Sequence, residues 1–331
     1  MKKFVVEYIR RESCPACSCF AEEAKAVGEI KAVNYRLGKH YVPAHGYTAR
    51  TRVLLCPECG LYYKDHVPEP ASLLRLFECS AGEVWNWNNR YDYESEIRIA
   101  QGLFPGKRPG VLDVGSSNGE LLRSFSSFCS RLSALDVVRN PVCEKYVNDE
   151  FITGWLEEEQ LSWSGRPYDL VTLFDVVEHL LHVSRGFKNL RELVRPGGYV
   201  LIETGDAESY LPRRYGAGNW YYLNRIEHHV AFTRKSISKI AKMFGFTVTL
   251  SLRKRHKNVN TFSFFRIARS LAISAAYRVY PAGYLKVVDL IFERPIGQPR
   301  NPLEDDHMFI TLRRDEEPDF VSWKLLRRKA Q

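Results

Sequence analysis

The chain has 331 residues, of which 45% are apolar and 26% charged, so it can bury a core and has the composition of a soluble globular protein. Its apolar stretches are shorter than the ~20 residues of a membrane-spanning helix, and we see no secretory signal, so we expect a cytoplasmic protein. The net charge of +9 invites a nucleic-acid partner, but much of it lies in two clusters, at 253–257 and 324–329, that are typical of solvated surfaces. Nucleic-acid binding is therefore not the main expectation.

Residues 1–70 form the first of three predicted regions and carry two Cys-x-x-Cys pairs, with a Pro or Gly beside them that favours tight turns. The pairs are Cys14 with Cys17 and Cys56 with Cys59. In a reducing compartment such pairs indicate a metal rather than disulfides. Four thiolates on two turns suit tetrahedral zinc, and the long spacer is compatible with a small zinc-ribbon-like module. We predict a closed, structural Zn²⁺ site, in which Cys19 could replace one ligand.

Residues 71–255 form the second region, in which short apolar runs alternate with helical patterns. The runs that we predict to be strands are 111–114, 132–135, 170–174, 199–202 and 247–252. Apolar stripes at helix spacing cover 187–194, before a Pro-Gly-Gly turn, and 237–244, before a glycine. This alternation predicts an α/β fold with a parallel sheet covered on both faces. The third region, 256–331, adds a helical insertion and a last strand at 308–312.

A glycine turn follows the strand at 111–114. Gly115 and Gly119 allow a sharp turn and a close approach to a ligand, and the following helix presents free N–H groups. Ser117 stands where a dinucleotide-binding turn needs its second glycine, and no Gly-Lys-Ser/Thr follows, so both a pyrophosphate and a P-loop fit poorly. Asp136 ends the next strand, about twenty residues on, and can accept hydrogen bonds from both hydroxyls of a ribose.

Four segments in this order resemble class I S-adenosylmethionine-dependent methyltransferases, over residues 95–250. They are Asp-Val-Gly-x-x-x-Gly at 113–119, the strand and Glu-His-Leu at 169–180, the helix, Pro-Gly-Gly turn and strand at 191–204, and Glu-His-His before the last helix at 227–233. The resemblance implies a Rossmann-like, seven-stranded, mostly parallel sheet and S-adenosylmethionine as the cofactor. It also covers a subgroup that carries a zinc module before the catalytic domain and in many cases acts on sugars or natural-product scaffolds.

The resemblance further implies which residues bind the cofactor. They are Asp113, Gly115, Ser116 and Gly119 for the aminoacyl part, Asp136 for the ribose, Trp155 and Leu156 for the adenine, and Asp175 for the methionine part. Trp155 could instead be a plain core residue.

Methyl transfer from a sulfonium needs alignment, exclusion of water and, for a hydroxyl or acidic carbon, a general base. His229, His228 and Glu227 are the candidates, because their segment should lie above the crevice, and His179 is the second choice. The aromatic segment 210–222 is either a substrate loop or a packed insertion, and aromatics at 85–93 could cover the cofactor.

We therefore expect an S-adenosylmethionine-dependent methyltransferase acting on a small molecule, such as a nucleotide- or lipid-linked sugar or a natural-product intermediate. The basic amphipathic segment 260–295 could contact a membrane surface, although packing on the catalytic domain or on a second subunit is the stronger expectation. Two alternatives remain open. The basic balance and the zinc module allow an RNA methyltransferase, and the fold could also serve a non-catalytic scaffold.

Overall fold

A computed structural model describes residues 6–30, 35–37, 40–42, 51–80, 93–254, 272, 275, 279–280 and 305–316. The predictions for the aromatics at 85–92, for almost all of 260–295 and for the basic cluster at 324–329 lie outside the described residues. Among the helices that are described, none is long and apolar enough to cross a membrane.

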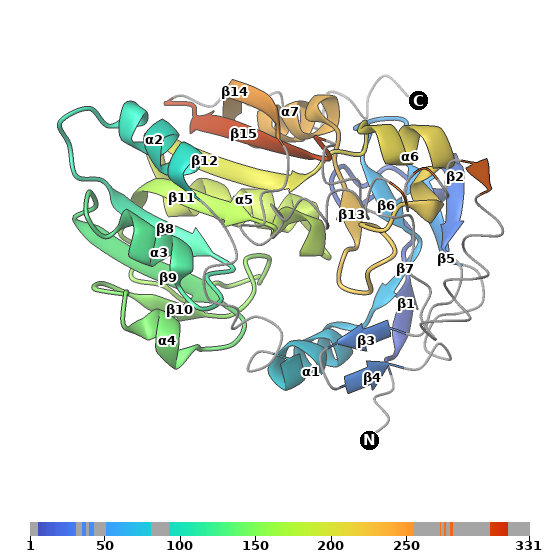
Figure 1. Cartoon of the computed structure of the whole chain (residues 1–331), viewed down its shortest axis with the longest axis horizontal. Coiled ribbons are helices and arrows are strands. Elements are labelled where there is room, and N and C mark those ends of the chain that lie inside the picture. Colours follow the sequence, from blue (N-terminus) through green and yellow to red (C-terminus); the bar gives the residue numbers. More distant parts are fainter. Residues whose placement is uncertain are drawn as a thin grey trace.

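A seven-stranded sheet forms the larger part of the molecule (Figure 1). Its strands, in spatial order, are β10 (Phe151–Thr153), β9 (Arg131–Asp136), β8 (Gly110–Val114), β11 (Tyr168–Phe174), β12 (Val194–Gly205), β15 (His307–Arg314) and β14 (Phe246–Lys254). All neighbouring strands are parallel except the two pairs made by β15. The mostly parallel sheet predicted from the sequence is therefore confirmed, with each expected run inside a strand.

Helices cover both faces of this sheet. They are α2 (Glu94–Leu103), α3 (Glu120–Phe125), α4 (Pro141–Glu144), α5 (Val183–Leu193) and α7 (Arg234–Met243). Successive strand residues point to opposite faces, so Leu170 joins the buried cluster of Phe125 in α3, whereas Val171 joins that of Phe187 in α5. Strands buried on both sides explain the continuous apolar runs. Val194 belongs to β12 rather than to the preceding helix, where we predicted it.

A second, four-stranded antiparallel sheet holds the cysteine-bearing region. Its order is β13 (Val230–Ala231), β6 (Tyr62–Lys64), β5 (Thr51–Leu55) and β2 (Lys25–Ile30). Two small antiparallel pairs, β1 (Tyr8–Arg10) with β7 (His66–Pro68) and β3 (Tyr35–Leu37) with β4 (His40–Val42), complete the described strands. Because β13 comes from the methyltransferase-like region, the second sheet joins residues from both sides of the boundary predicted at residue 70. The three-region division stays a prediction.

The aromatic segment 210–222 is packed rather than open. It forms α6 (Tyr210–Tyr215) and the 3-10 turn η4 (Ala217–Asn219). Trp220 and Tyr222 are buried and their rings stack at 4.9 Å. A Cβ on Gly218 would lie 2.5 Å from the backbone nitrogen of Glu29, so β2 packs directly against the turn. Of the two interpretations of segment 210–222, a substrate loop or a packed insertion, the structure shows the packed insertion. The remaining elements are α1 (Pro70–Ser80) and the 3-10 turns η1 (Ala21–Glu23) and η3 (Val177–His179).

Candidate active site

A pocket opens where the parallel strands β8, β9 and β11 end. Its volume is about 870 Å³, counting the part that is open to solvent. The ends of parallel strands in an open α/β sheet are where such folds bind ligands, at the point where the strand order reverses. The turns after β8, β9, β10 and β11 all contribute to its wall, which positions the side chains considered below.

The glycine turn forms one wall. Gly115 lines the pocket with a φ of +70°, and a Cβ there would lie 2.5 Å from Cγ2 of Val176, so a side chain is excluded. Ser117 also lines the pocket. Gly119 serves packing instead, because a Cβ there would lie 2.8 Å from Cα of Cys143 in α4. The turn therefore brings backbone, rather than side chains, to the ligand space.

Asp136 faces this turn from the end of β9. Its Oδ2 accepts a hydrogen bond from the backbone N–H of Ser117 at 2.8 Å, and its Oδ1 accepts one from Val138 at 3.3 Å. Burial raises the pKa of Asp136, while these backbone donors act in the opposite direction. A carboxylate has about four lone-pair directions, so acceptor capacity remains for a ligand hydroxyl. These acceptor oxygens fit the ribose predicted for the position.

Asp113 and Ser116 lie behind the wall. Asp113 is buried, accepts a hydrogen bond from Oγ1 of Thr172 at 2.6 Å, and has its pKa raised to about 7 by burial. Ser116 is also buried and accepts a contact from Sγ of Cys143 at 3.4 Å. Neither side chain is among the residues that line the pocket. Both support the turn, and their predicted role toward the aminoacyl group stays a prediction.

The opposite wall is apolar and includes the predicted Trp155 and Leu156. It also includes Phe77 of α1, which the sequence analysis missed. The ring of Phe77 lies 5.6 Å from that of Trp155 and 6.2 Å from that of His179. Phe77 thus contacts both Trp155, on the side expected to hold the adenine, and His179, a candidate base. The sequence signal that could have identified Phe77 is the apolar stripe of α1, to which the buried Leu73 and Leu76 also belong.

A polar cluster lies at the floor of the pocket, beyond β11. Asp175 and His179 line the pocket, and Glu178 lies fully buried between them in sequence. Glu178 accepts hydrogen bonds from Oγ1 of Thr204 at 2.8 Å and from the hydroxyl of Tyr222. Burial, reinforced by the charge of Asp175, raises the pKa of Glu178 to about 7.

The three predicted histidines are placed differently. His179 lines the pocket, and its ring lies 4.7 Å from that of His228, which packs on Tyr222. Burial lowers the pKa of His179, and lowers that of His228 further, so both rings are neutral near pH 7. Within the described part of the chain, Nδ1 of each ring has no hydrogen-bond partner. These rings can accept a proton, and together with Glu178 they offer atoms within 4.8 Å of one another that would also suit a cation.

His229 is not among the residues that line the pocket. Its side chain is fully buried, and neither ring nitrogen has a hydrogen-bond partner among the residues that the structure describes. Its backbone connects η3 to β6: the N–H donates to the carbonyl of Glu178 at 2.8 Å, and the carbonyl accepts from the N–H of Lys64 at 3.0 Å. Burial and the nearby charge of Lys64 hold the pKa of His229 well below its usual range. Its position favours a structural role.

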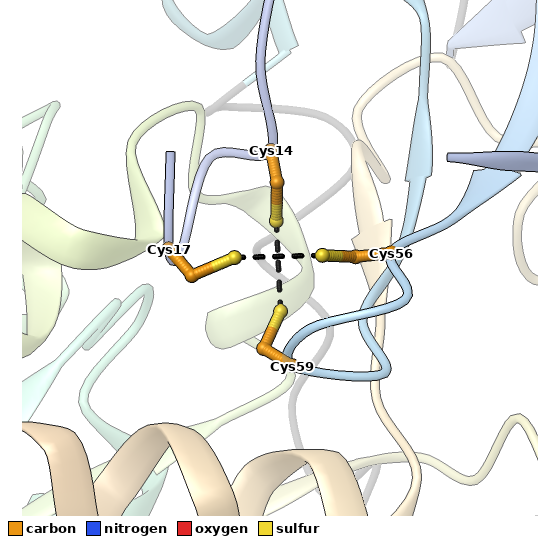
Figure 2. Close-up of side chains that lie close together, drawn as sticks. All are labelled: Cys14, Cys17, Cys56 and Cys59. Carbon is orange, nitrogen blue, oxygen red and sulfur yellow. Dashed lines mark hydrogen bonds between the residues drawn. The ribbon is translucent and has the colours of Figure 1, made fainter. Parts of the chain in front are cut away.

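The four predicted cysteine ligands converge on one point (Figure 2). The Sγ atoms of Cys14 and Cys59 lie 3.6 Å apart, and those of Cys17 and Cys56 lie 3.4 Å apart. A tetrahedral zinc with Zn–S bonds of about 2.3 Å separates its sulfurs by roughly 3.8 Å, so the cluster fits this geometry closely. Cys19 lies outside it and instead contacts the carboxylate of Glu23 at 3.0 Å.

Known proteins share the central part of this architecture. Residues 89–251 match a family described as methyltransferase domain. A ubiquinone biosynthesis O-methyltransferase of Escherichia coli O6:H1 is 30% identical over 166 residues, which are 47% of this chain and 66% of that protein. One from Escherichia coli O157:H7 is 29% identical over 195 residues, 54% of this chain and 80% of that protein. The chain thus spans just under two thirds of the first relative's length.

A solved structure, the 1,6-didemethyltoxoflavin-N1-methyltransferase of Burkholderia thailandensis, is 16% identical with a TM-score of 0.49 and covers 74% of this chain and 88% of its own. The parallel sheet, the glycine turn and the carboxylate across from it define a Rossmann-like domain that binds a nucleoside cofactor. With the sequence relatives, these features identify residues 89–251 as a methyltransferase domain of the class I S-adenosylmethionine-dependent type.

Proposed function

We propose that the chain transfers a methyl group from S-adenosylmethionine to a hydroxyl of a small molecule bound in the pocket beside Phe77 and His179. The observation that carries the proposal is that Asp136, suited to a ribose, and His179, a neutral imidazole, line the same pocket. The relatives named as O-methyltransferases support oxygen as the acceptor atom.

The residues of the chain have separate tasks in this reaction. Bound S-adenosylmethionine supplies a methyl group on a positively charged sulfur. Asp136 binds the ribose hydroxyls, and Trp155 with Leu156 packs against the adenine. Phe77 and Trp155 exclude water from the reacting atoms. His179 accepts the proton of the acceptor hydroxyl as its oxygen bonds to the methyl carbon and the sulfur–carbon bond breaks.

The acceptor class is the finer part of the proposal. The sequence favours a nucleotide- or lipid-linked sugar or a natural-product intermediate, whereas the relatives named for ubiquinone biosynthesis favour a phenolic ring. The ring of Phe77 can stack on either kind of acceptor ring. Incubation with methyl-labelled S-adenosylmethionine and separate pools of phenolic and sugar-linked compounds would distinguish them. Label in neither pool, or label in RNA, would contradict the proposal.

We also propose that Cys14, Cys17, Cys56 and Cys59 hold a structural Zn²⁺. The close convergence of four sulfurs supports this, since a closed four-thiolate site leaves no open position for chemistry. Metal analysis of the purified protein tests it, with one equivalent of zinc as the expected result.

A further inference from the structure

The last strand returns a histidine to the pocket edge that the proposed mechanism does not use. Because β15 runs antiparallel between β12 and β14, its first residue lies where the parallel strands end: His307 pairs with Gly205 of β12 and with Lys254 of β14. Its side chain is buried. A charged or polar side chain at this edge can reach the pocket although it is more than a hundred residues from the pocket motifs in the sequence.

His307 lies between two carboxylates. Its Nδ1 is 2.8 Å from Oδ1 of Asp306, and its Nε2 is 3.7 Å from Oδ1 of Asp175. Asp306 is itself held, because its Oδ2 accepts a hydrogen bond of 2.5 Å from the hydroxyl of Tyr221. A carboxylate at hydrogen-bond distance on one side and another at ion-pair distance on the other favour the imidazolium form, in which both nitrogens carry a proton. Burial lowers the pKa of His307, but the two carboxylates outweigh it and raise the pKa to about 10.

Asp175 is the carboxylate through which His307 meets the pocket. It follows β11, has a φ of +53°, and donates its backbone N–H to the carbonyl of Glu203 at 2.9 Å. A positive φ is uncommon outside glycine and is kept only where the surroundings enforce it. The next residue, Val176, contacts Gly115, so Asp175 lies beside the glycine turn. Asp175 itself also lines the pocket.

We propose that His307 is a positioning residue that holds the Asp175 carboxylate in place to bind the ammonium group of the cofactor's amino-acid tail. The inference rests on the proposed function, since it requires the cofactor in this pocket. A primary ammonium donates charge-assisted hydrogen bonds, and a carboxylate fixed by an imidazolium binds it without first having to be ordered.

Two ligands test this, because they differ in that tail. S-adenosylhomocysteine carries the ammonium, whereas 5′-methylthioadenosine has the same nucleoside and sulfur but no amino-acid part. For His307→Gln, calorimetry should show about a tenfold weaker affinity for S-adenosylhomocysteine, the loss of a charge-assisted contact, and unchanged affinity for 5′-methylthioadenosine. Asp175→Asn should behave alike. The double variant should lose little more than either single variant, because both act through one contact.

His66→Gln is the matched control, since Nδ1 of His66 also lies 2.9 Å from the aspartate that precedes it, Asp65, but away from the pocket. It should leave both affinities unchanged. Unchanged S-adenosylhomocysteine binding in His307→Gln would overturn the inference alone, and so would equal losses for both ligands or independent, multiplying losses in the double variant. A wild-type chain that binds neither ligand would overturn the proposed function and this inference with it.

Discussion

Two walls of the pocket are built in different ways: the one proposed to bind the cofactor (the cofactor wall) and the one proposed to bind the methyl acceptor (the acceptor wall). The cofactor wall consists of the turns that follow adjacent strands, so Gly115, Ser117 and Asp136 are placed by short-range motifs and held by backbone hydrogen bonds. The acceptor wall combines Phe77 from α1 with His179, and the neighbouring Glu178 is held by the buried Tyr222; these residues are far apart in the sequence. A local motif can therefore define what donates the methyl group, while the packing of distant segments decides what receives it.

The cysteine module supports the acceptor wall, and its loss should have the largest effect. β6 of the module pairs with β13, and Lys64 Nζ donates to the carbonyl of Arg225 at 2.6 Å. We expect Cys56→Ser to lose the metal and to lower the free energy of unfolding by about 5 kcal/mol or more. Metal analysis and thermal unfolding measure both quantities.

Cys19→Ser is the control for that variant, because Cys19 is a neighbouring thiol outside the cluster. It should keep the metal and its melting temperature. If Cys56→Ser remained as stable and as metal-loaded as the wild type, the module would not depend on these thiolates.

The next largest effect is the loss of turnover when the candidate base His179 is replaced, which replacement of His229 should not cause. His179→Gln should lower kcat by about 10²–10³-fold, the contribution of a general base, while S-adenosylhomocysteine still binds. His229→Gln should retain turnover, because His229 does not line the pocket. Steady-state kinetics with a labelled methyl group would show the split. Turnover that requires added Mg²⁺ and fails in both His179→Gln and His228→Gln would instead assign the cluster to cation binding.

A smaller effect belongs to the cofactor wall. Asp136→Asn keeps the shape of the side chain but removes the charge that accepts two hydroxyl donors, so affinity for S-adenosylhomocysteine should fall about 30-fold, near 2 kcal/mol. Asp149→Asn is a suitable control, since Asp149 bonds Ser133 and Arg166 outside the pocket. Equal affinities of the two variants would remove Asp136 from the ribose site.

The smallest expected effect is in the pH dependence of turnover. A base must be neutral, and burial lowers the pKa of His179 from 6.5, so its neutral form should persist at pH 6.5. We expect kcat at pH 6.5 to equal that at pH 7.5 and to fall only in more acidic buffer. An ordinary exposed histidine would already lose about half of its activity at pH 6.5. That twofold loss would contradict the buried base.

The same comparison explains what the sequence could predict. Apolar runs and the glycine turn depend on near neighbours, so the strands of the large sheet and the places of Gly115, Asp136 and Trp155 on the pocket wall followed from pattern. The bond from Tyr222 to Glu178 spans 44 residues and that from Tyr221 to Asp306 spans 85. A local sequence pattern cannot predict contacts over such separations. His229 was placed before His179 as the candidate base because chain order does not show which of these side chains lines the pocket.

The most direct test of the account is a crystal structure of the chain with S-adenosylhomocysteine. It should show the ribose hydroxyls within hydrogen-bond distance of the Asp136 carboxylate, the adenine against Trp155, and the sulfur turned toward His179. A ligand bound elsewhere, or a ribose out of reach of Asp136, would contradict the assignment of this pocket.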